Sequence, residues 1–471
     1  MNCETGPPFS PDHCYDCRYQ FTLQARMLAR IRDSALLSAN PRLSALLRNV
    51  GVLITGNALN GVLSLVYLAI ITRALGLEQF GLYGLYMAYV GLFTRLTGFQ
   101  TWQGLIAFGT PAYEKKDRGL LLDLLCLGSL LDFASGIVGY VLALLIAVMV
   151  PFWFGLGEDA STNVAIVASM LIFNWRNIPV ALLRIYDAFL PQAVFSNVAS
   201  ALQLVAVSIL YWQGEERMIV YLTVTTINNI VGQLGFYLYA VWRAHKDGLF
   251  SVNSINLRTL PARCPGITKF LLATNGDGFV RVLRDLDVFI VNALLGIAAA
   301  GLYRIARLLT RAIGQLTGPF YQSIYPELAR FLANNDHTSM VQLMRQSAIL
   351  LGSLTLICWL GFMLLGKTFL ALVFGADFTA AYSVAAWCIG GMVVWGATHP
   401  LSPAMMAWHQ AGTALKINFA TTCIYVVALY LLTSALGLEG AGVALLTFYI
   451  IWGIVMSIAV SRHFKSLRAR S

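Results

Sequence analysis

The sequence contains few charged residues. Asp, Glu, Lys and Arg make up 11% of the 471 residues, whereas 58% are hydrophobic and the mean hydropathy is +0.70. Soluble globular domains carry about 25% charged residues, because their surfaces face water. This chain has too little polar surface for that solvent, so the composition predicts an integral membrane protein.

Sequence signatures of enzymes are also scarce. No H-E-x-x-H, G-x-S-x-G or D-D-x-x-D motif occurs, and the six histidines fall in tails, loops or expected span ends. The expected outer loops are all short, so none could hold a substrate by itself. We therefore expect no enzyme activity, no cofactor and no metal centre.

Long apolar runs occupy most of the chain. A helix needs about 20 mainly apolar residues to cross a bilayer, and hydropathy predicts twelve such spans. They cover residues 50–73, 81–107, 119–150, 162–186, 190–212, 217–241, 266–295, 301–323, 339–365, 380–399, 413–436 and 440–461. We expect a partly disordered tail at 1–48, a lobe of six spans at 49–241, a linker at 242–265, a second lobe of six spans at 266–461 and a basic tail at 462–471.

The basic residues are distributed unevenly about these spans. With the N-terminus inside, most Lys and Arg fall in the tails and the even-numbered loops. Examples are Arg26, Arg30, Arg32, Arg42, Arg48, Lys115, Lys116, Arg118, Arg462, Lys465, Arg468 and Arg470. The outer side has only Arg73, Arg217 and Lys367. Cytoplasmic loops carry the excess of basic residues in membrane proteins, so we expect both termini in the cytoplasm. The basic residues thus follow membrane topology, and we expect no nucleic acid partner.

The start of the chain contains a lone C-x-x-C pair, Cys14 and Cys17. A structural zinc site needs about four ligands, so the pair alone does not predict one, and its role stays open. We expect residues 1–26 to be disordered, and Met1 and Met27 are both candidate start residues. We expect no cleavable signal peptide, because a long basic tail precedes the first span.

One connecting segment occurs twice in the sequence. "ALGLEQFGLY" at 74–83 matches "LLGIAAAGLY" at 294–303 after a shift of 220 residues. The identical residues are Leu75-Gly76 with Leu295-Gly296, Gly81-Leu82-Tyr83 with Gly301-Leu302-Tyr303, and Leu96-Thr97-Gly98 with Leu316-Thr317-Gly318. A weaker third copy, "ALGLEGAGVA", lies at 435–444. In both hairpins the first helix leaves the cytoplasmic side and the second returns to it. The two copies therefore have the same orientation, and we expect a pseudo-two-fold axis along the membrane normal.

The repeated segment has the composition of a turn between two helices. Its first glycine suits a helix end that needs a left-handed residue, and its second can begin the next helix or allow a close approach. We expect Tyr83 and Tyr303 at the outer membrane interface, where an aromatic ring with a polar tip is favoured. Any helical hairpin could use this recipe, but here the match continues well into the second helix.

Arginine inside a span is costly, at about 2.5–3.5 kcal/mol at the bilayer centre. The arginines expected well inside the spans are Arg95, Arg176, Arg281, Arg284, Arg304, Arg307 and Arg311. Those at 304, 307 and 311 are spaced i, i+3, i+7 and so share one helix face, which Gln315 and Gln322 continue. Other polar faces are formed by Asp277, Arg281, Arg284 and Asp285 with Asp287 nearby, and by Asn57, Asn60 and Ser64.

These polar faces are typical of the wall of a water-filled cavity. The arginines outnumber the carboxylates Asp132, Asp277, Asp285 and Asp287, so an anionic ligand would complete the charge balance. Arginine suits phosphate, because its planar fork donates two hydrogen bonds at once. Alternatively, i, i+4 pairs in the seventh span merely neutralise buried charge. The arginines of the eighth span have no acidic residue on their own helix, and Arg304 lies near enough to the outer surface to reach water.

Four segments resemble the Wzx-type polysaccharide flippases of the multidrug/oligosaccharidyl-lipid/polysaccharide exporter superfamily. They are "ITRALGLEQFGLYGLYMAYVGLF" at 71–93, "DLDVFIVNALLGIAAAGLYRIARLL" at 285–309, "FYQSIYPELARF" at 320–331 and "LVFGADFTAAYSVAAWCIGG" at 372–391. Each is short and apolar, but the four occur in the family's order. The resemblance covers about residues 45–460. It implies an all-α membrane protein of about 12 transmembrane helices, with two six-helix lobes around a V-shaped cavity as in the MATE fold.

The resemblance also implies a function. Such proteins flip oligosaccharide units linked to undecaprenyl pyrophosphate from the cytoplasmic to the periplasmic leaflet of the bacterial inner membrane, for O-antigen, capsule or exopolysaccharide assembly. Alternating access would be coupled to an ion gradient, commonly of protons. The partners expected are the lipid-linked oligosaccharide and membrane lipids, with a polysaccharide polymerase and chain-length proteins as further candidates.

Depth and helix face then select the candidate site residues. For contact with the pyrophosphate they are Arg281, Arg284 and Arg311, with Arg95 and Arg307 in support. For ion coupling they are Asp277, Asp285 and Asp287.

Two other classes of protein share parts of this pattern. A multidrug or cation exporter of the same superfamily would have the same fold but an acidic surplus in its cavity, and the first span offers Asn57 and Asn60 in place of a carboxylate. A membrane glycan polymerase or ligase, which is an enzyme, usually needs a large outer loop. The sequence leaves open which sugar is carried, which ion is coupled and the oligomeric state.

Overall fold

The computed structural model describes residues 41–99, 101–149, 159–251, 255–268, 271, 280, 282–333, 336–408 and 410–468. Residues 1–40 lie outside the described residues, and with them the C-x-x-C pair and Met27. Asp277 and Arg281 lie outside them too. Residues Leu53–Ser471 form one compact unit.

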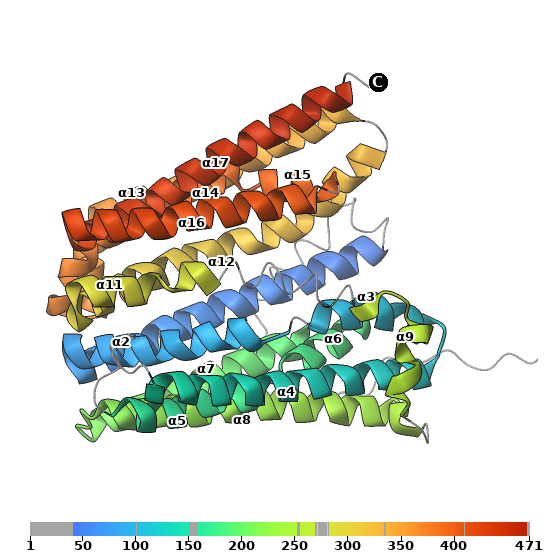
Figure 1. Cartoon of the computed structure of the whole chain (residues 1–471), viewed down its shortest axis with the longest axis horizontal. Coiled ribbons are helices and arrows are strands. Elements are labelled where there is room, and N and C mark those ends of the chain that lie inside the picture. The colour runs from blue at the N-terminus through green and yellow to red at the C-terminus, as the bar shows by residue number, and fades with distance from the viewer. Residues whose placement is uncertain are drawn as a thin grey trace, which may run out of the picture. The chain divides into compact units, whose positions relative to one another are not determined.

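The described residues are almost entirely α-helical and contain no strand (Figure 1). The helices of the first lobe, the N-lobe, are α2 Pro41–Thr97, α3 Thr101–Glu114, α4 Arg118–Met149, α5 Ala160–Ile172, α6 Asn177–Ile185, α7 Leu190–Trp212 and α8 Met218–Lys246. Those of the second, the C-lobe, are α11 Asp287–Leu295, α12 Ile297–Ala333, α13 His337–Val373, α14 Tyr382–Thr398, α15 Leu401–Ala407, α16 Ala411–Leu436 and α17 Leu438–Arg468. Every predicted span overlaps one of these helices, which confirms the predicted fold class.

Length and hydropathy identify nine segments of the described chain that could cross a membrane. The first of them runs from Thr55 to Thr97 and covers most of the first and second predicted spans, because α2 continues through a bend at Gly76. Helix α12, which carries Arg330 besides the three arginines of the stripe, is not among the nine. Its charge makes it a poor match to lipid and a good match to a polar interior.

The second and fourth predicted spans are each broken, although hydropathy predicts them as single helices. The breaks lie between α2 and α3 and between α5 and α6. Both meet at Asp132 of α4, whose Oδ1 accepts hydrogen bonds from Thr101 Oγ1 (3.0 Å) and Asn177 Nδ2 (2.9 Å). The same Asn177 amide also donates to the Phe99 carbonyl oxygen (2.9 Å). Irregular backbone is tolerated at membrane depth where protein covers it, and Asp132 is only 4% exposed.

The repeated Leu-Gly connector has nearly the same backbone in all three copies. Gly76, Gly296 and Gly437 have φ values of 67°, 85° and 63° with ψ values of −177°, 177° and −143°. This left-handed φ costs glycine little, because it has no Cβ. Each of the three glycines divides two helical segments, so the repeat seen in the sequence is also a repeat of backbone geometry.

The two lobes touch at the end of the bundle where Gly76 and Gly296 lie, which we call the connector end. Gly81 and Gly301, the second glycines of the repeat, pack backbone to backbone: a Cβ added to Gly301 would lie 3.1 Å from the Gly81 Cα. A Cβ added to Gly81 would overlap the carbonyl oxygen of Ile297. The repeated glycine thus allows a close approach between lobes, which is one of its two predicted uses.

Side chains extend this contact. Thr72 Oγ1 donates to the carbonyl oxygen of Phe374 (3.2 Å), and Arg304 donates to the carbonyl oxygen of Gly84. The rings of Phe80 and Phe378 meet edge to face, with centroids 5.6 Å apart. Arg304 thus binds a backbone acceptor of the other lobe, and the residue remains partly exposed.

Tyr83 and Tyr303 are buried, with 2% and 0% of their surface exposed. The Tyr83 hydroxyl lies 3.2 Å from Thr225 Oγ1, and the Tyr303 hydroxyl donates to Asp287 Oδ2 (3.0 Å). Protein therefore covers both rings, and their depth in the membrane stays a prediction. The sequence does not show that protein covers both rings at this end.

The hydrophobic cores differ between the two ends of the bundle. One core joins buried residues of both lobes, among them Phe80, Tyr83, Tyr303, Phe374, Phe378 and Tyr425. At the opposite end, which we call the linker end, a core around Leu124 and Leu182 belongs to the N-lobe and another around Leu328 and Met456 belongs to the C-lobe. In the described part of the chain, the large core shared by both lobes lies at the connector end, and from the second lobe only Ile267 and Leu271 join a core at the linker end.

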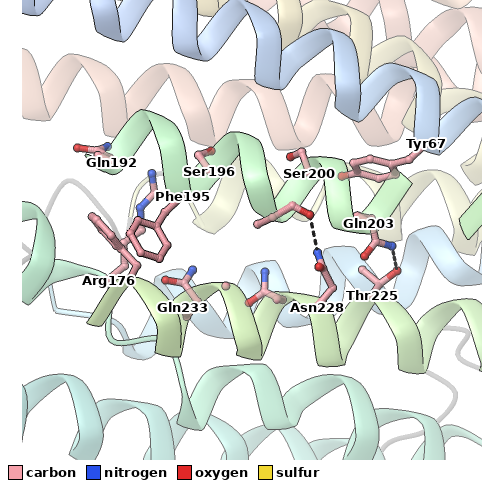
Figure 2. A pocket seen from close by; sticks show the side chains of 14 residues that line it. Tyr67, Arg176, Gln192, Phe195, Ser196, Ser200, Gln203, Thr225, Asn228 and Gln233 are labelled. Carbon is pink, nitrogen blue, oxygen red and sulfur yellow. Dashed lines mark hydrogen bonds between the residues drawn. The ribbon is translucent and has the colours of Figure 1, made fainter. Parts of the chain in front are cut away.

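Helices α7 and α8 pack against each other, yet they enclose a cavity of about 230 Å³ (Figure 2). Tyr67 of α2 and Arg176, just before α6, complete its lining. Most of the side chains that line it are polar but uncharged. The cavity is unusual for that reason, since neighbouring positions on these helices are apolar.

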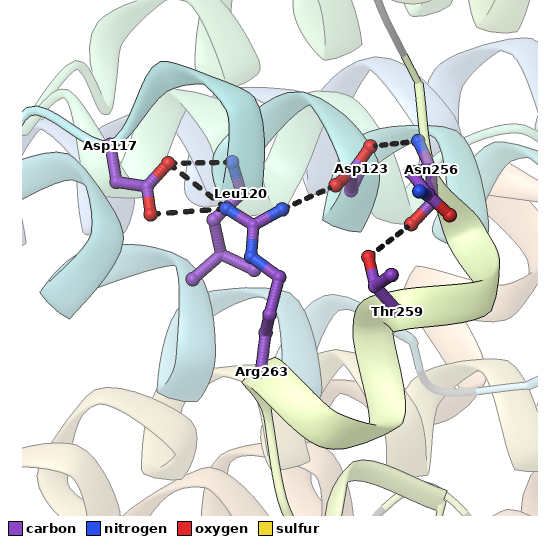
Figure 3. A network of polar contacts seen from close by, with 6 residues as sticks. All are labelled: Asp117, Leu120, Asp123, Asn256, Thr259 and Arg263. Carbon is purple, nitrogen blue, oxygen red and sulfur yellow. Dashed lines mark hydrogen bonds and ion pairs between the residues drawn. The ribbon is translucent and has the colours of Figure 1, made fainter.

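The linker is attached to the N-lobe at the linker end (Figure 3). After α8 it forms the 3-10 turns Leu249–Ser251 and Leu257–Thr259 and the short helix α9, Leu260–Arg263. Arg263 donates to Asp123 Oδ2 of α4 (2.7 Å) and to both carboxylate oxygens of Asp117 (3.1 Å). The backbone N–H of Asn256 donates to Asp123 Oδ1 (2.8 Å). These bonds fix the linker to the turn before α4 and to the first turns of that helix.

Candidate cationic binding site

A second cavity, of about 260 Å³, lies between the lobes. We call it the arginine cavity. It is lined by Arg95, Arg284, Asp285, Arg307, Arg311, Tyr425, Leu445, Phe448 and Tyr449. Four of the five arginines predicted to contact an anion therefore line one space, together with one of the three predicted ion-coupling carboxylates. Three members of those groups do not line it: Arg281 and Asp277 lie outside the described residues, and Asp287 is buried beside Arg307.

Helical periodicity explains why only part of the α12 stripe faces the cavity. Arg307 and Arg311 are spaced i, i+4 and so lie one above the other on the same face. Arg304 lies one turn nearer the connector end, where it bonds to Gly84 of the other lobe. The stripe thus divides into one arginine that joins the lobes and two that line the cavity.

Asp285 lies between two of these arginines. Arg95 of the N-lobe forms an ion pair with it, and Arg311 Nη2 lies 3.8 Å from its Oδ1. The side chain of Asp285 is 14% exposed, whereas those of Arg95 and Arg311 are 44% and 59% exposed. Asp285 is therefore the internal anion of the cavity, and its pair with Arg95 joins one lobe to the other.

Asp287 lies deeper, in a polar cluster within the shared core. Its Oδ2 lies 2.8 Å from Arg307 Nε and accepts hydrogen bonds from the hydroxyls of Tyr303 (3.0 Å) and Tyr425 (3.3 Å). Its Oδ1 accepts from the backbone N–H of Val288 (2.8 Å). The side chain is 2% exposed, so a charge there requires partners of this kind. Asp287 neutralises Arg307 and fixes the start of α11.

Aromatic residues form the opposite wall of the arginine cavity. The Arg284 guanidinium lies over the ring of Phe448, 5.5 Å from its centroid. Phe448 in turn contacts Tyr425 and Tyr449, with ring centroids 5.3 Å and 5.2 Å apart. A guanidinium that stacks on a ring keeps its N–H groups in its own plane, directed along the ring surface. The contact places the Arg284 guanidinium against the aromatic wall of the cavity.

Among the described residues, the arginines that line the cavity outnumber the carboxylates that meet them. Four guanidinium groups meet the carboxylates of Asp285 and Asp287. Arginine side chains keep their charge at any physiological pH, so the site is cationic. Guanidinium groups from α2, α12 and the segment before α11 can together surround an anion with several oxygens.

Sequence reasoning missed the tyrosines of this site. Tyr303 and Tyr425 hydrogen-bond Asp287, but nothing in the sequence places them beside it. The uncharged lining of the α7–α8 cavity was missed as well. A signal for that lining exists, since Gln192, Ser196, Ser200 and Gln203 recur at helical spacing along α7. Asn60, from the predicted polar face of the first span, accepts a hydrogen bond from Ser200.

One segment of α13 matches a nucleotide-binding motif in sequence but not in structure. Residues 361–368 read "GFMLLGKT", which satisfies the G-x-x-x-x-G-K-[ST] pattern. A P-loop needs a glycine-rich turn between a strand and a helix, whereas α13 continues through all of these residues. The segment therefore cannot surround a phosphate. The described residues also contain no group of three metal-ligating side chains.

Known proteins share the fold and part of the sequence. The inner membrane protein YghQ of Escherichia coli K12 is 24% identical over 340 residues, which cover 72% of this chain and 95% of that protein. An inward-facing multidrug resistance MATE family transporter of the MOP superfamily superimposes with a TM-score of 0.71 at 13% identity, over 87% of this chain and 96% of that one. The lipid II flippase MurJ in an inward closed conformation gives a TM-score of 0.66 at 14% identity, over 87% of each chain.

These likenesses establish a multi-pass membrane protein with the transporter fold of that superfamily. At such low identity the solved structures carry the fold alone. The sequence match is more specific, because residues 46–332 fit the family described as polysaccharide biosynthesis protein. That segment is more than half of the 471 residues, and the chain therefore belongs to the polysaccharide biosynthesis protein family.

Proposed function

We propose that the protein flips oligosaccharide units linked to undecaprenyl pyrophosphate from the cytoplasmic to the periplasmic leaflet of the bacterial inner membrane. The units would serve O-antigen, capsule or exopolysaccharide assembly. The observation that carries the proposal is the arginine cavity, in which four guanidinium groups meet two carboxylates. A pyrophosphate supplies negative charge and the oxygens that a guanidinium fork binds in pairs.

Such a cargo would have to displace an ion pair when it binds. Asp285 already occupies Arg95 and Arg311, so a pyrophosphate competes with it for the same donors. Because Arg95 belongs to the N-lobe and Asp285 to the C-lobe, cargo that replaces Asp285 also breaks a bond between the lobes. Binding is thereby linked to lobe movement, which alternating access requires.

Ion coupling fits the same pair. A proton on Asp285 removes its charge and weakens its hold on Arg95 and Arg311. Asp287, the other candidate among the described residues, is held by Arg307 and two tyrosine hydroxyls and is less accessible. We therefore favour Asp285 over Asp287 as the coupling carboxylate, with the linker end facing the cytoplasm.

A drug or cation exporter of the same superfamily would need the opposite charge in this space. The arginine cavity repels cations, and both the Asp285 carboxylate in its lining and the deeper Asp287 carboxylate are engaged by arginines. A glycan polymerase or ligase would need catalytic groups around the cavity, where the lining offers guanidinium, aromatic and aliphatic side chains and one paired carboxylate. The lining therefore supports transport of an anionic cargo over either alternative.

Translocation in proteoliposomes tests the proposal. Purified protein would be reconstituted with undecaprenyl-pyrophosphate-linked oligosaccharide extracted from its host, and movement between leaflets followed with an impermeant glycosidase. Arg311→Ala should slow movement at least about tenfold, since a hydrogen bond to a charged group contributes about 1.5–3 kcal/mol. Arg345→Ala, which removes an exposed arginine of α13, is the matched control and should leave the rate unchanged. Equal rates for Arg311→Ala and the parent protein would contradict the phosphate role of the cavity.

A further inference from the structure

The α7–α8 cavity is lined by two polar stripes that face each other (Figure 2). Along α7 the stripe is Gln192, Ser196, Ser200 and Gln203, with Phe195 and Ala199 between them. Along α8 it is Thr225, Asn228, Asn229 and Gln233, with Gly232 and Phe236. Both follow steps of three and four residues, so each occupies one face of its helix. Chance placement would spread these polar residues around the helices and leave some against lipid.

The lining offers amide and hydroxyl groups and almost no charge. Among the described residues that line it, Arg176 is the only charged one, and no carboxylate is present. Amides and hydroxyls each donate and accept hydrogen bonds, as sugar hydroxyls and N-acetyl groups do. Phe195, Phe236 and Tyr67 add aromatic surface to the same space. This chemistry suits a sugar and differs from the charged arginine cavity, which suits phosphate.

Contacts within the cavity use only part of this hydrogen-bonding capacity. Gln203 Nε2 donates to Thr225 Oγ1 (2.9 Å), and Asn228 Nδ2 donates to the Ala199 carbonyl oxygen (3.1 Å). These two bonds hold α7 to α8. The Oε1 atom of Gln203 is buried without a partner, on a residue that is 2% exposed. A buried acceptor without a partner destabilises the fold, and a bound hydroxyl would supply the missing hydrogen bond.

Helix association alone does not account for the other amides. Within the described chain, the side chains of Gln192, Asn229 and Gln233 have no hydrogen-bond partner. Polar groups without partners are disfavoured inside a membrane and mark ligand pathways there. Binding pockets for whole small molecules occupy about 300–1,000 Å³. A cavity of about 230 Å³ therefore holds part of a larger ligand.

We propose that the α7–α8 cavity is the sugar-binding subsite of the protein, separate from the arginine cavity that takes the pyrophosphate. The inference rests on the proposed function. It assigns Gln192, Asn229 and Gln233 to hydroxyl or N-acetyl groups of the oligosaccharide. Arg176, with no carboxylate beside it in the lining, disfavours sugars that carry a free amine. The two cavities then bind different parts of one cargo. The α7–α8 cavity within the N-lobe binds the sugar, and the arginine cavity between the lobes binds the phosphates.

Two probes separate the subsites. One is undecaprenyl pyrophosphate without sugar, and the other is the same lipid carrying a single N-acetylglucosamine, with affinity measured on the full-length protein in nanodiscs. The parent protein should bind the sugar-bearing lipid more tightly. The double variant Gln192→Ala/Gln233→Ala should bind it about tenfold more weakly, because it loses two hydrogen bonds of about 0.5–1.5 kcal/mol each. Its affinity for the bare lipid should not change, which also shows that the variant is folded.

Control variants make the result specific. Gln342→Ala/Gln346→Ala makes the same chemical change on the exposed face of α13 and should affect neither probe. Ser196→Phe fills the cavity and should weaken sugar-dependent binding as the double variant does. Arg311→Ala should weaken both probes alike. The inference is overturned if the double variant and Ser196→Phe bind the sugar-bearing lipid like the parent, or if they lose equal affinity for both probes.

The same measurements separate this inference from the proposed function. If the parent protein binds and flips both lipids alike, the sugar subsite is wrong while the flippase function stands. If it binds neither lipid and moves neither between leaflets, the proposed function is wrong and the subsite fails with it.

Discussion

Gly81 of α2 and Gly301 of α12 pack backbone to backbone across the boundary between the two lobes. They occupy equivalent positions in the two copies of the repeat, so one duplicated residue supplies both sides of the contact. Helices approach this closely only where neither carries a side chain. The pair therefore keeps the connector end closed in this structure.

Adding one methyl group to Gly81 should open this end. The new Cβ would overlap the Ile297 carbonyl oxygen, which cannot move without α12. We expect Gly81→Ala to raise the rate at which an impermeant maleimide labels Thr72→Cys, a position that is 1% exposed, by about fivefold or more. Labelling can be read at the peptide level by mass spectrometry. Gly91→Ala is the control, because a Cβ there meets nothing within 4 Å, and equal labelling in both variants would contradict the prediction.

Asp285→Asn should tighten binding of bare undecaprenyl pyrophosphate. The substitution removes the anion that competes for Arg95 and Arg311, so we expect affinity to rise about tenfold, the effect of about 1.4 kcal/mol. Turnover should fall, since the cargo would then leave more slowly. Calorimetry and the translocation assay give the two quantities. Weaker binding in this variant would show that Asp285 positions the arginines and does not compete with the ligand.

Asp287→Ala should destabilise the protein. It leaves the buried Arg307 guanidinium and the hydroxyls of Tyr303 and Tyr425 without their shared acceptor, and breaking a buried ion pair costs about 3–5 kcal/mol. Thermal unfolding in detergent should reveal a clearly lower midpoint than in the parent. Asp377→Ala removes an exposed carboxylate and should leave the midpoint unchanged. A parent-like midpoint for Asp287→Ala would mean that the cluster is not part of the core.

Removing Arg263 should release the linker. Arg263 alone joins the linker to both Asp117 and Asp123 by side-chain ion pairs, and the neighbouring Cys264 is 4% exposed. Arg263→Ala should therefore speed alkylation of Cys264 severalfold at constant pH, as followed by peptide mass spectrometry. Arg258→Ala, in the same linker, is the matched control. An unchanged rate in Arg263→Ala would show that the buried Leu260 and Cys264 are sufficient to hold the segment.

Acid should release the linker too. The pKa of the Asp117 carboxyl is held below its usual value, mainly by the hydrogen bond from the Leu120 N–H and further by Arg263. A carboxyl whose pKa is lower in the folded state stabilises that state above its unfolded pKa of about 3.9, and the contribution is lost as the pH falls through the folded value. Hydrogen exchange of the linker, corrected for intrinsic rates, should stay constant from about pH 8 to about pH 5 and rise below about pH 4. Asp117→Asn should remove the part of this rise that depends on Asp117.

The sequence predicts the arginine cavity well because charge in a membrane is costly. Arg95, Arg284, Arg307 and Arg311 stand out from an apolar background, and helical spacing alone places Arg307 and Arg311 together. Their partners are less evident, since Arg95 meets Asp285 across 190 positions of chain. The repeated connector could also be predicted from the sequence, because a left-handed turn between helices requires glycine at a fixed place.

The remaining features depend on contacts between distant segments. The breaks after Thr97 and Ile172 are supported by Asp132 on another helix, and hydropathy averages over both breaks. Tyr83 and Tyr303 have the composition of interface residues and are buried because another lobe covers them. The α7–α8 stripes are hard to predict for a different reason: glutamine and asparagine carry no charge, so they do not stand out within a span as arginine does.

The core shared at the connector end has a consequence for the conformational equilibrium. A state that is open at this end must separate Phe80 from Phe378 and expose apolar surface that is now buried between the lobes. Without cargo, the protein should therefore rest in the present state, and a ligand must bind the other state more tightly by the same free energy to populate it. A larger shared core would trap the protein before transport, and a smaller one would let it cycle empty and dissipate the ion gradient. The size of this single apolar contact thus sets the balance between efficient transport and leak.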